Sequence, residues 1–433
     1  MGMERVAVLT FALLAFSHID STEVSKPEQV HLSYGRNASE MVVTWSTQNV
    51  KSDSIVKYGL DSGSLNMEAK GYSTKFVDGG QLHHTQYIHR VRLINLKPGQ
   101  TYYYTCGSSS GWSAVFWFKA MRVDKDWSPS IALYGDMGNT NAQSLPRLKK
   151  EVNMYDAILH IGDFAYDMFM DNGTIGDEFM QKIQTVAAHL PYMTCPGNHE
   201  STYNFSNYKN RFTMPGDEDS SNMFYSFDMG PVHFISISTE YYFFLQYGVI
   251  QVVKQFYWLE RHLKEVTSPA YRAKHPWIIL FGHRPMYCSN NDADDCSQFE
   301  SRVRCGIPYL HWLCLEKLLY NYGVDVAFWA HEHSYERLWP TFDRKVYNGS
   351  IKEPYTNPRA PVHIITGSAG CKERHDKFIK HRPEWSAFRS DDYGYTRIKI
   401  LNSSHLQLQQ VSDDQGGKVI DEIMIIKDKH GPY

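Results

Sequence analysis

The first quarter of the chain alternates between apolar and polar residues in short runs. Between 26 and 120 these runs are separated by turn residues, and examples are MVVTWST, SIVKYG and TYYYTCGS. Period-two alternation puts every second side chain on the same face of a strand. No stretch in this region shows the 3.6-residue period of an amphipathic helix. The pattern therefore predicts an antiparallel all-β sandwich of about seven strands.

One corner of this sandwich has a more specific signature. Leu96 and Tyr102 lie on either side of a Pro-Gly turn that precedes a late strand. The arrangement resembles a fibronectin type III domain, in which a leucine and a tyrosine fix such a corner. We therefore expect a fibronectin-III-like domain over 26–120.

After a polar linker at 122–129 the pattern changes, because strands begin to alternate with helices. Runs such as IALYGD, AILHIGD and WIILFGH predict buried strands, and helices are predicted at 251–265 and 309–322. Near the C-terminus the alternation of antiparallel strands returns. The expected fold of 129–433 is an α/β sandwich of mixed β-sheets flanked by helices.

Residues 1–22 have the composition of a secretory signal peptide. A basic residue precedes an apolar run from Val6 to Phe16, and small residues follow. This run is too short to span a bilayer, and no later segment is long and apolar enough to do so. We expect a secreted glycoprotein without a membrane span. Glycosylation sequons occur at Asn37, Asn172, Asn204, Asn348 and Asn402.

Charge and cysteine content narrow the function classes. A formal net charge of −3 over 433 residues provides no basic footprint for a nucleic acid or an anionic membrane. Four of the seven cysteines lie between 288 and 314, where one or two local disulfides are expected in an oxidising compartment. Spacing alone leaves their pairing open, and the sequence leaves the oligomeric state open.

Several predicted strands end on side chains that can bind metal ions. The carboxyl ends of strands in an open α/β sheet form the ligand-binding crevice. Any one of these side chains alone is more typical of a turn, a helix cap or a buried histidine. Their repetition at successive strand ends favours one metal site. The donors are Asp136, Asp163, Tyr166, Asn198, His283, His331 and His333.

The chemistry of this donor set indicates two ions. Two carboxylates, a phenol, an amide and three imidazoles exceed what a tetrahedral zinc site uses, and suit two ions that share a carboxylate. On an extended segment, His331 and His333 would present both imidazoles on one face. A phenol is an unusual ligand for zinc or magnesium but suits Fe(III), a hard Lewis acid. We predict Fe(III) beside a divalent ion, with iron, zinc and manganese all open for the latter.

The motifs around these residues resemble those of the purple acid phosphatase family. GDMG, GDFAY, GNHE, GHRPMY and AHEHSYER follow the order of the five metallophosphoesterase motifs, with the tyrosine that marks this family. The motifs span 130–337, and the preceding sandwich is similar to the N-terminal domain of larger members. The resemblance, which extends to the animal long form, implies an acid phosphatase. Such an enzyme hydrolyses small phosphate monoesters by in-line attack of a metal-bound hydroxide.

The resemblance also implies a role for each position. Asp163 would bridge the two ions, His199 would contact phosphate and protonate the leaving oxygen, and Glu200 would orient the His199 ring. Fe(III) would be bound by Asp136, Asp163, Tyr166 and His333. The divalent ion would be bound by Asp163, Asn198, His283 and His331.

Two features depart from the family pattern. Plant members carry histidines in the loop after the fourth motif, whereas this loop has Asp292, Asp294 and Asp295. Either these carboxylates lie near the site and disfavour strongly anionic substrates, or a disulfide holds the loop away from the site. Ala330 replaces a usual glycine, a change that is tolerated unless the position needs a positive φ.

Two other functions stay open. The same binuclear site could hydrolyse phosphodiesters or nucleotides, and assays on paired monoester and diester substrates distinguish this function. Alternatively, the chain could be a catalytically silent extracellular binding protein. A metal-loaded protein that is inactive on every phosphate ester would favour that alternative.

Overall fold

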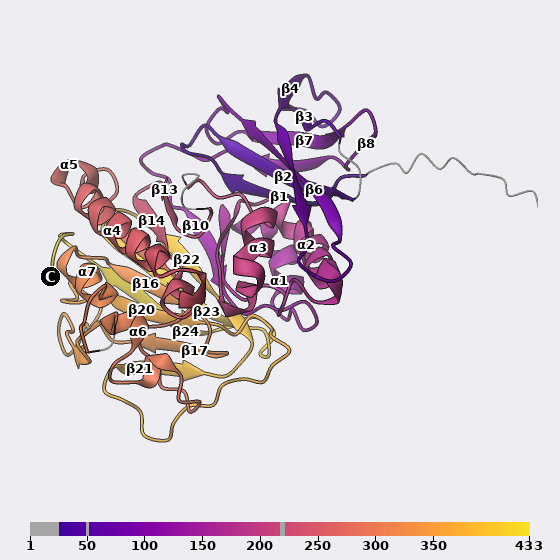
Figure 1. Ribbon diagram of the computed structural model, residues 1–433. Coiled ribbons are helices and arrows are strands. Elements are labelled where there is room, and N and C mark those ends of the chain that lie inside the picture. The colour runs from indigo at the N-terminus through magenta and orange to yellow at the C-terminus, as the bar shows by residue number, and fades with distance from the viewer. Residues whose placement is uncertain (1–25, 49–51, 217–220, 308) are drawn as a thin grey trace, which may run out of the picture.

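The computed structural model describes residues 26–48, 52–216, 221–307 and 309–433, so the expected signal peptide lies outside the described residues. The N-terminal part is a β-sandwich of two antiparallel sheets (Figure 1). One sheet has the order β1 (Glu28–Tyr34), β2 (Met41–Gln48), β6 (Thr85–Leu93) and β5 (Tyr72–Val77). The other contains β4 (Met67–Lys70), β3 (Ile55–Gly59), β7 (Thr101–Ser108), β8 (Gly111–Trp112) and β9 (Phe116–Lys119).

The corner of this sandwich forms as expected. The Lys97 N–H donates to the Tyr102 hydroxyl at 2.9 Å, and Leu96 is buried beside it. The sandwich has more strands than predicted, because β4, β5 and β8 carry few buried apolar side chains. Edge strands that face solvent lack the apolar alternation that identifies a strand in a sequence.

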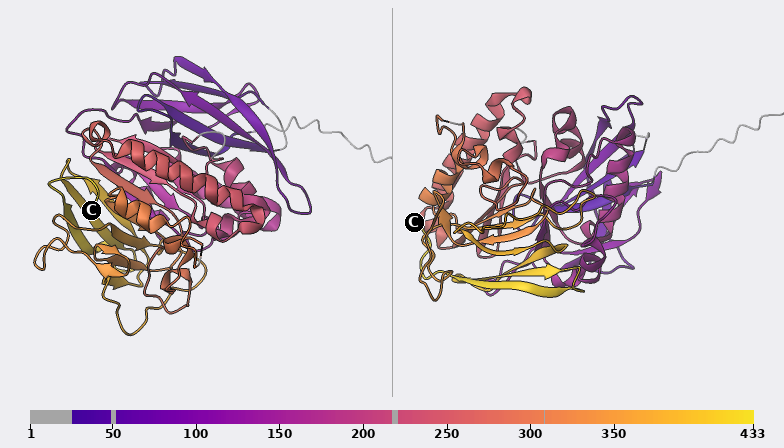
Figure 2. Two further views of the ribbon diagram at one scale, coloured as in Figure 1. Left: turned by 60° about the vertical axis from the view of Figure 1, so that its left-hand side comes forward. Right: turned by 90° about the horizontal axis from the view of Figure 1, so that it is seen from below.

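The second part contains two larger mixed sheets that lie against each other (Figure 2). The first has the order β12 (Tyr192–Cys195), β11 (Ala157–Ile161), β10 (Ser130–Tyr134), β22 (Gly394–Ile400), β23 (His405–Ser412) and β24 (Lys418–Ile426). The second has the order β13 (Tyr225–Met229), β14 (Val232–Ser236), β15 (Trp277–Phe281), β16 (Val326–Trp329), β20 (Val362–Thr366), β17 (Tyr335–Leu338) and β21 (Ser386–Ser390). A small hairpin consists of β18 (Thr341–Phe342) and β19 (Lys345–Val346).

The parallel strands of these sheets are almost completely buried. β10, β11 and β12 run parallel in the first sheet, as do β14, β15, β16 and β20 in the second. Their residues are mostly apolar, as expected for strands covered on both faces. These observations confirm the predicted α/β sandwich of mixed sheets.

Helices flank the sheets on both sides (Figure 1). They are α1 (Leu145–Lys150), α2 (Thr174–Ala187), α3 (Thr202–Arg211), α4 (Val249–Val266), α5 (Pro269–Arg272), α6 (Arg302–Cys305) and α7 (Leu315–Asn321). α4 contains the helix predicted at 251–265. The prediction for 309–322 was wrong in its first half, because Tyr309, His311 and Leu313 have positive φ and the helix begins at Leu315. Among the described residues, no helix could cross a membrane.

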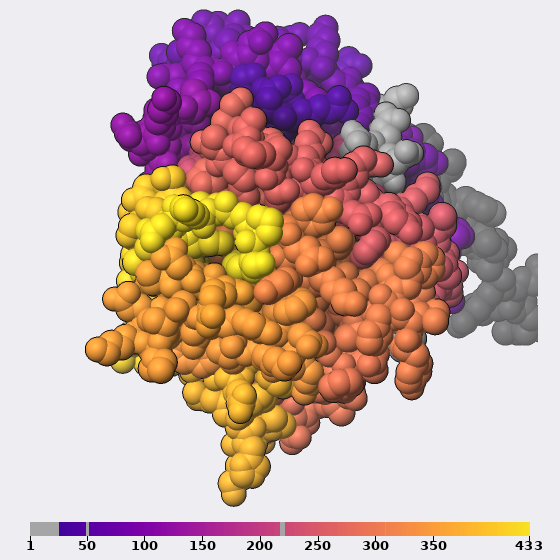
Figure 3. Space-filling view, turned by 90° about the vertical axis from the view of Figure 1, so that its left-hand side faces the viewer, coloured from indigo at the N-terminus to yellow at the C-terminus, as the bar shows by residue number. Residues whose placement is uncertain are grey.

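The N-terminal sandwich packs on the second part through α2. The Gln29 amide donates to Asp177 at 3.0 Å, and the Val30 N–H donates to Gln184 at 2.8 Å. On the face shown in Figure 3, the indigo and violet sandwich packs against pink segments from the middle of the sequence. The yellow C-terminal segment lies beside orange segments. The sandwich thus contacts the helix that follows the segment of Asp163 and Tyr166, and it contributes no predicted ligand itself.

Candidate metal centre

The predicted donors follow the carboxyl ends of buried strands. Asp136, Asp163 and Asn198 come within three residues of the ends of β10, β11 and β12. In the facing sheet, His283 and His331 come two residues after β15 and β16. Since each set of strands is parallel, their ends meet at one edge of the sandwich. The fold thus brings together side chains from motifs nearly 200 residues apart.

The seven side chains form two adjoining groups. In the first, the Tyr166 hydroxyl lies 3.2 Å from Asp136 Oδ1 and 2.8 Å from His333 Nε2. In the second, His283 Nε2 lies 3.2 Å from both Asn198 Oδ1 and His331 Nδ1. The seventh side chain, Asp163, joins the second group.

Asp163 holds its place by contacts with two segments. Its Oδ2 lies 3.2 Å from His283 Nε2, and its Oδ1 accepts from the His199 N–H at 3.0 Å. One ligand atom from each of Asp163, His283 and His331 lies within 4.8 Å of the others, close enough to bind a common ion.

The orientation of His283 fits metal binding. Its Nδ1 lies 3.0 Å from the Ile161 carbonyl and donates its proton there, so Nε2 is the ring nitrogen that would bind an ion. Metal-binding histidines are commonly oriented in this way by a carbonyl on the other ring nitrogen. Within the described residues, no Lys or Arg forms an ion pair with Asp136 or Asp163, although both are almost fully buried. The donor set therefore fits resident cations.

Four predicted donors have left-handed backbone conformations. The φ angles are 58° at Asp136, 50° at Asp163, 55° at Tyr166 and 72° at His331. Such conformations cost roughly 1–3 kcal/mol each and are concentrated at functional sites, where the surrounding structure holds them. The strain lets each side chain turn from its strand end into the shared site.

Two glycines make room for these turns. A Cβ at Gly162, whose φ is +93°, would lie 2.4 Å from His283 Nδ1. A Cβ at Gly197 would lie 2.1 Å from Asp163 Oδ1. The glycines of the GDFAY and GNHE motifs thus allow close approach between the strand ends.

Burial and the charges of neighbouring side chains determine the pKa values of the acids and histidines in the centre. Burial raises the pKa of Asp136 to about 7. Burial opposes ionisation of Asp163 as well, but His283 and His199 hold its pKa well below the ordinary value. Burial would lower the pKa of His283, but Asp163 raises it to about 10. In the absence of cations, His283 and His199 thus carry the positive charge that balances Asp163.

His199 lies at the accessible side of the centre. Its Nδ1 lies 2.9 Å from Asp167 Oδ1, and its Nε2 lies 3.9 Å from Asp163 Oδ2. Burial would lower the pKa of His199, but Asp163 and Asp167 raise it to about 9. The side chain is 20% exposed, so the imidazole reaches both the centre and solvent.

Glu200 does not take the position expected for it beside the His199 ring. Its carboxylate accepts from the backbone N–H groups of Asp163, Phe164 and Gly197 at 2.8–3.0 Å. It therefore ties the GDFAY turn to the GNHE turn, while Asp167 contacts the imidazole of His199. The sequence places Glu200 next to His199, but adjacent residues in a 3₁₀ turn point in different directions.

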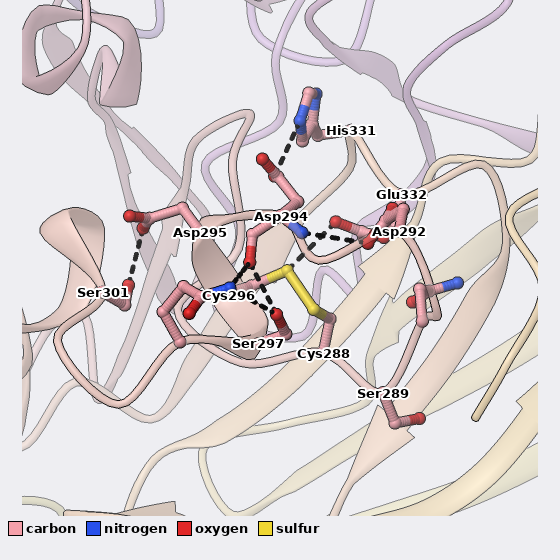
Figure 4. The surroundings of a disulfide bond; sticks show 12 residues. Cys288, Ser289, Asp292, Asp294, Asp295, Cys296, Ser297, Ser301, His331 and Glu332 are labelled. Carbon is pink, nitrogen blue, oxygen red and sulfur yellow. Dashed lines mark hydrogen bonds and ion pairs between the residues drawn. A yellow bond between two sulfur atoms is a disulfide. The ribbon is translucent and has the colours of Figure 1, made fainter. Parts of the chain in front are cut away.

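The loop after the fourth motif lies beside the centre and is closed by the Cys288–Cys296 disulfide (Figure 4). Asp294 Oδ2 lies 2.9 Å from His331 Nε2. Asp295 instead accepts from the Ser301 hydroxyl and the Arg302 N–H, and so caps α6. The loop is disulfide-bonded, yet one of its carboxylates contacts a predicted ligand. The other cysteines are unpaired and buried: Cys106, Cys195, Cys305, Cys314 and Cys371.

The segment that carries His331 and His333 is bent, which differs from the extended conformation expected. β16 ends at Trp329, and residues 331–334 form successive bends. The two imidazoles consequently enter different groups, one beside His283 and the other beside Tyr166. Ala330 is outside the left-handed region, so its methyl group adds no backbone strain.

Several residues at the centre were not identified from the sequence. The Arg284 guanidinium lies 2.7 Å from His331 Nε2, and Asp376 accepts from the His333 N–H at 2.7 Å. Cys371 Sγ lies 3.4 Å from His333 Nδ1. Asp376 belongs to the charged stretch 372–380, which resembles a solvated loop in the sequence, and Cys371 directly precedes that stretch. Arg284 could have been found, since it follows His283 directly.

Comparisons with known proteins agree with this architecture. The family model "Purple acid Phosphatase, N-terminal domain" matches residues 27–120, "Calcineurin-like phosphoesterase" matches 129–335, and "Iron/zinc purple acid phosphatase-like protein C" matches 360–422. The solved structure of the purple acid phosphatase PPD1 from yellow lupin superposes with a TM-score of 0.78 at 24% identity, covering 93% of this chain and 75% of that one.

Curated relatives cover nearly the whole chain. Acid phosphatase type 7 of Danio rerio is 56% identical, over 94% of this chain and 93% of the relative. The Homo sapiens protein of the same name is 54% identical, over 94% and 92%. Purple acid phosphatase 18 of Arabidopsis thaliana is 31% identical, over 93% and 85%. The chain therefore belongs to the purple acid phosphatase family, and within it resembles the animal acid phosphatases type 7.

Proposed function

We propose that the chain is a secreted acid phosphatase that hydrolyses small phosphate monoesters at a centre of Fe(III) and one divalent ion, either iron, zinc or manganese. The observation that carries this proposal is the division of the other six donors into two groups beside Asp163. The group that contains the phenol suits a hard trivalent ion, and the group with two imidazoles and an amide suits a divalent ion.

In this proposal Asp163 would contribute to both ions. Fe(III) would be held by Asp136, Asp163, Tyr166 and His333. The divalent ion would be held by Asp163, Asn198, His283 and His331. When bound, such ions polarise the phosphoryl oxygens and lower the pKa of water, which Fe(III) does more strongly than a divalent ion.

The residues of the chain then orient the phosphate and supply the proton. The Asn198 amide nitrogen would donate to a phosphoryl oxygen, since its Oδ1 is the atom that faces His283. His199 donates the proton that the leaving oxygen needs, because Asp167 binds its Nδ1 and thereby directs Nε2 toward the centre. Glu200 keeps the two turns that carry these groups in register.

The setting of the centre favours a small substrate. The side chains of His199, His331 and His333 are 20%, 17% and 11% exposed, so the site opens to solvent at their edges. The net charge of −3 disfavours nucleic acid as a partner. Asp294, beside His331, adds negative charge that disfavours strongly anionic substrates.

Secretion would follow from a signal peptide at 1–22, ahead of domains at 26–120 and 129–433. Among the five sequons, Asn37 and Asn402 have exposed side chains, whereas Asn172, Asn204 and Asn348 are partly buried. Glycans are therefore most easily accommodated at Asn37 and Asn402.

Metal analysis combined with visible spectroscopy tests the proposal. The purified protein should contain iron plus one further ion per chain and show a tyrosinate-to-Fe(III) charge-transfer band that Tyr166→Phe abolishes. It should also hydrolyse a monoester faster than the matched diester. A colourless protein with two divalent ions under oxidising conditions would contradict the Fe(III) assignment. A preference for the diester would contradict the substrate class.

A further inference from the structure

A buried carboxyl group next to the centre receives no hydrogen bond from an amide, a hydroxyl group or a cationic side chain of the described residues. Glu332 is 1% exposed, and its Oε2 has no partner among the described residues. Its Oε1 lies 3.0 Å from Cys296 Sγ, but this sulfur forms the disulfide with Cys288 and has no proton to donate (Figure 4). Leaving an ionised carboxylate buried without a partner costs several kcal/mol.

Two further carboxylates face Glu332. One oxygen atom from each of Asp292, Glu332 and Asp376 lies within 4.8 Å of the others. Asp292 Oδ1 accepts from the Asp294 N–H at 3.1 Å, and Asp376 Oδ2 accepts from the His333 N–H at 2.7 Å. Each aspartate therefore keeps a second oxygen free of these backbone bonds.

This cluster has no cationic side chain to balance it. In the described ranges, no Lys or Arg forms an ion pair with any of the three carboxylates, and the one ionic neighbour is the His333 imidazole, 3.7 Å from Asp376. An oxygen of Asp294 also lies within 4.8 Å of Glu332, but Asp294 is paired with His331 and Arg284. Like charges this close repel strongly at low dielectric, so a cation would remove both the repulsion and the unmet bonding of Glu332.

We propose that Asp292, Glu332 and Asp376 form a third cation site, the loop cation site, which binds Ca²⁺ separately from the catalytic centre. An all-carboxylate site suits a hard cation rather than a soft one. Ca²⁺ binds oxygen at about 2.3–2.6 Å, so two ligands on one ion lie at most about 5 Å apart, which accommodates the observed cluster. Flexible coordination by six to eight oxygens leaves room for water on the exposed side of Asp292.

The site would join three segments that are distant in the sequence. Asp292 comes from the disulfide loop, Glu332 lies between His331 and His333, and Asp376 comes from the stretch before β21. A bound ion would therefore fix the loop against the two histidine-bearing bends. Asp376 already contacts the His333 backbone, so the ion would stabilise that segment of the centre from outside.

Ca²⁺ titration of the purified holoenzyme tests the site. Equilibrium dialysis should find one Ca²⁺ per chain in addition to the catalytic ions, with a Kd of about 10⁻⁴–10⁻³ M. The thermal midpoint should rise with Ca²⁺ over the same range. Glu332→Gln should abolish both effects, and Asp292→Asn should weaken binding at least tenfold. Asp53→Asn, an exposed aspartate of the N-terminal sandwich, is the control and should bind Ca²⁺ as wild type does.

Asp292→Asn keeps the test valid if Glu332→Gln does not fold, because Asp292 is exposed on the loop. Retention of the extra Ca²⁺ by both variants would overturn the proposal. So would the absence of Ca²⁺ binding by wild type at neutral pH, which would mean that the carboxyl groups share a proton instead.

Discussion

Buried acids lie near both ends of strand β16, but these acids are balanced in different ways. At the amino end, Asp325 lies 2.9 Å from Arg272 Nη1 and 2.5 Å from Lys427 Nζ. At the carboxyl end, Asp136 and Asp163 meet histidines, and no Lys or Arg of the described chain pairs with them. One strand of four residues thus separates a self-sufficient ionic cluster from one that depends on ions in solution.

This difference distinguishes a structural cluster from a functional one. At Asp325 the protein supplies both charges, so the cluster can contribute to folding without any ligand. At the carboxyl ends the protein supplies oxygen and nitrogen donors on strained turns, an arrangement that leaves positive charge to bound cations. A buried acid with cationic partners is therefore a poor candidate for a site, and one without them is a good candidate.

Asp163→Asn should have the largest effect on function. Loss of the shared carboxylate removes several kcal/mol of transition-state stabilisation, so kcat/KM on a monoester should fall by about 10³-fold or more. The metal content should fall with it, while the unfolding free energy of the metal-free protein should not decrease. Steady-state kinetics, metal analysis and denaturant unfolding measure these quantities. Wild-type metal content and rate in the variant would contradict the proposed role.

His199→Ala should reduce proton donation to the leaving group without reducing metal binding at the carboxyl ends of the strands. Loss of a general acid reduces kcat by about 10²–10⁴-fold. The loss should be large for an alkyl phosphate and small for an aryl phosphate with an acidic phenol, since that leaving group needs less protonation. Metal content should stay at the wild-type value. Equal losses on the two substrates would contradict a proton-donor role.

Asp325→Asn should affect stability and leave the metal centre intact. Removing one partner leaves Arg272 and Lys427 buried without their anion, which costs about 3–5 kcal/mol. Denaturant unfolding of the metal-free protein measures the loss, and metal content per folded chain should be unchanged. Asp428→Asn, an exposed neighbour in sequence to Lys427, should change stability by less than about 0.5 kcal/mol. Loss of metal without loss of stability would contradict the distinction between the structural Asp325 cluster and the metal centre.

Acid should weaken the amino-end cluster through Asp325. Burial would raise the pKa of Asp325, but Lys427 and Arg272 hold it well below the ordinary value of 3.8. Below about pH 4 the unfolded chain therefore binds a proton that the folded chain does not, and stability decreases as the pH falls toward the folded pKa. Between pH 4 and 3, wild type should lose up to about 1.4 kcal/mol more than Asp325→Asn. Parallel pH profiles for the two proteins would contradict this.

The sequence predicted those parts of the fold that depend on local pattern. Alternation identified most strands of the N-terminal sandwich, and apolar runs identified the parallel strands that carry Asp136, Asp163 and His283. Strands with exposed polar residues, such as β4 and β5, were missed, because local pattern reports burial and these strands have little.

The sequence could predict those site residues whose position depends only on the strand that precedes them. A donor placed directly after a buried strand can be found from the sequence, since the end of the strand fixes its position. Partners that come from elsewhere in the chain could not be found in this way. The sequence suggested Glu200, the neighbour of His199, as the partner of the His199 ring, and Asp167 was overlooked. The sequence could assign Asp294 neither to the site nor to solvent.

The sequence by itself determined the architecture, the strand-end donors and the family, because these follow from periodicity and ordered motifs. Only the tertiary structure decided which buried carboxylates have a positively charged side chain beside them. Asp325 finds Lys427 about a hundred residues later, whereas Glu332 finds two further acids and a disulfide sulfur. Charge compensation depends on distances between segments that chain order does not specify, and those distances separate structural acids from acids that bind cations.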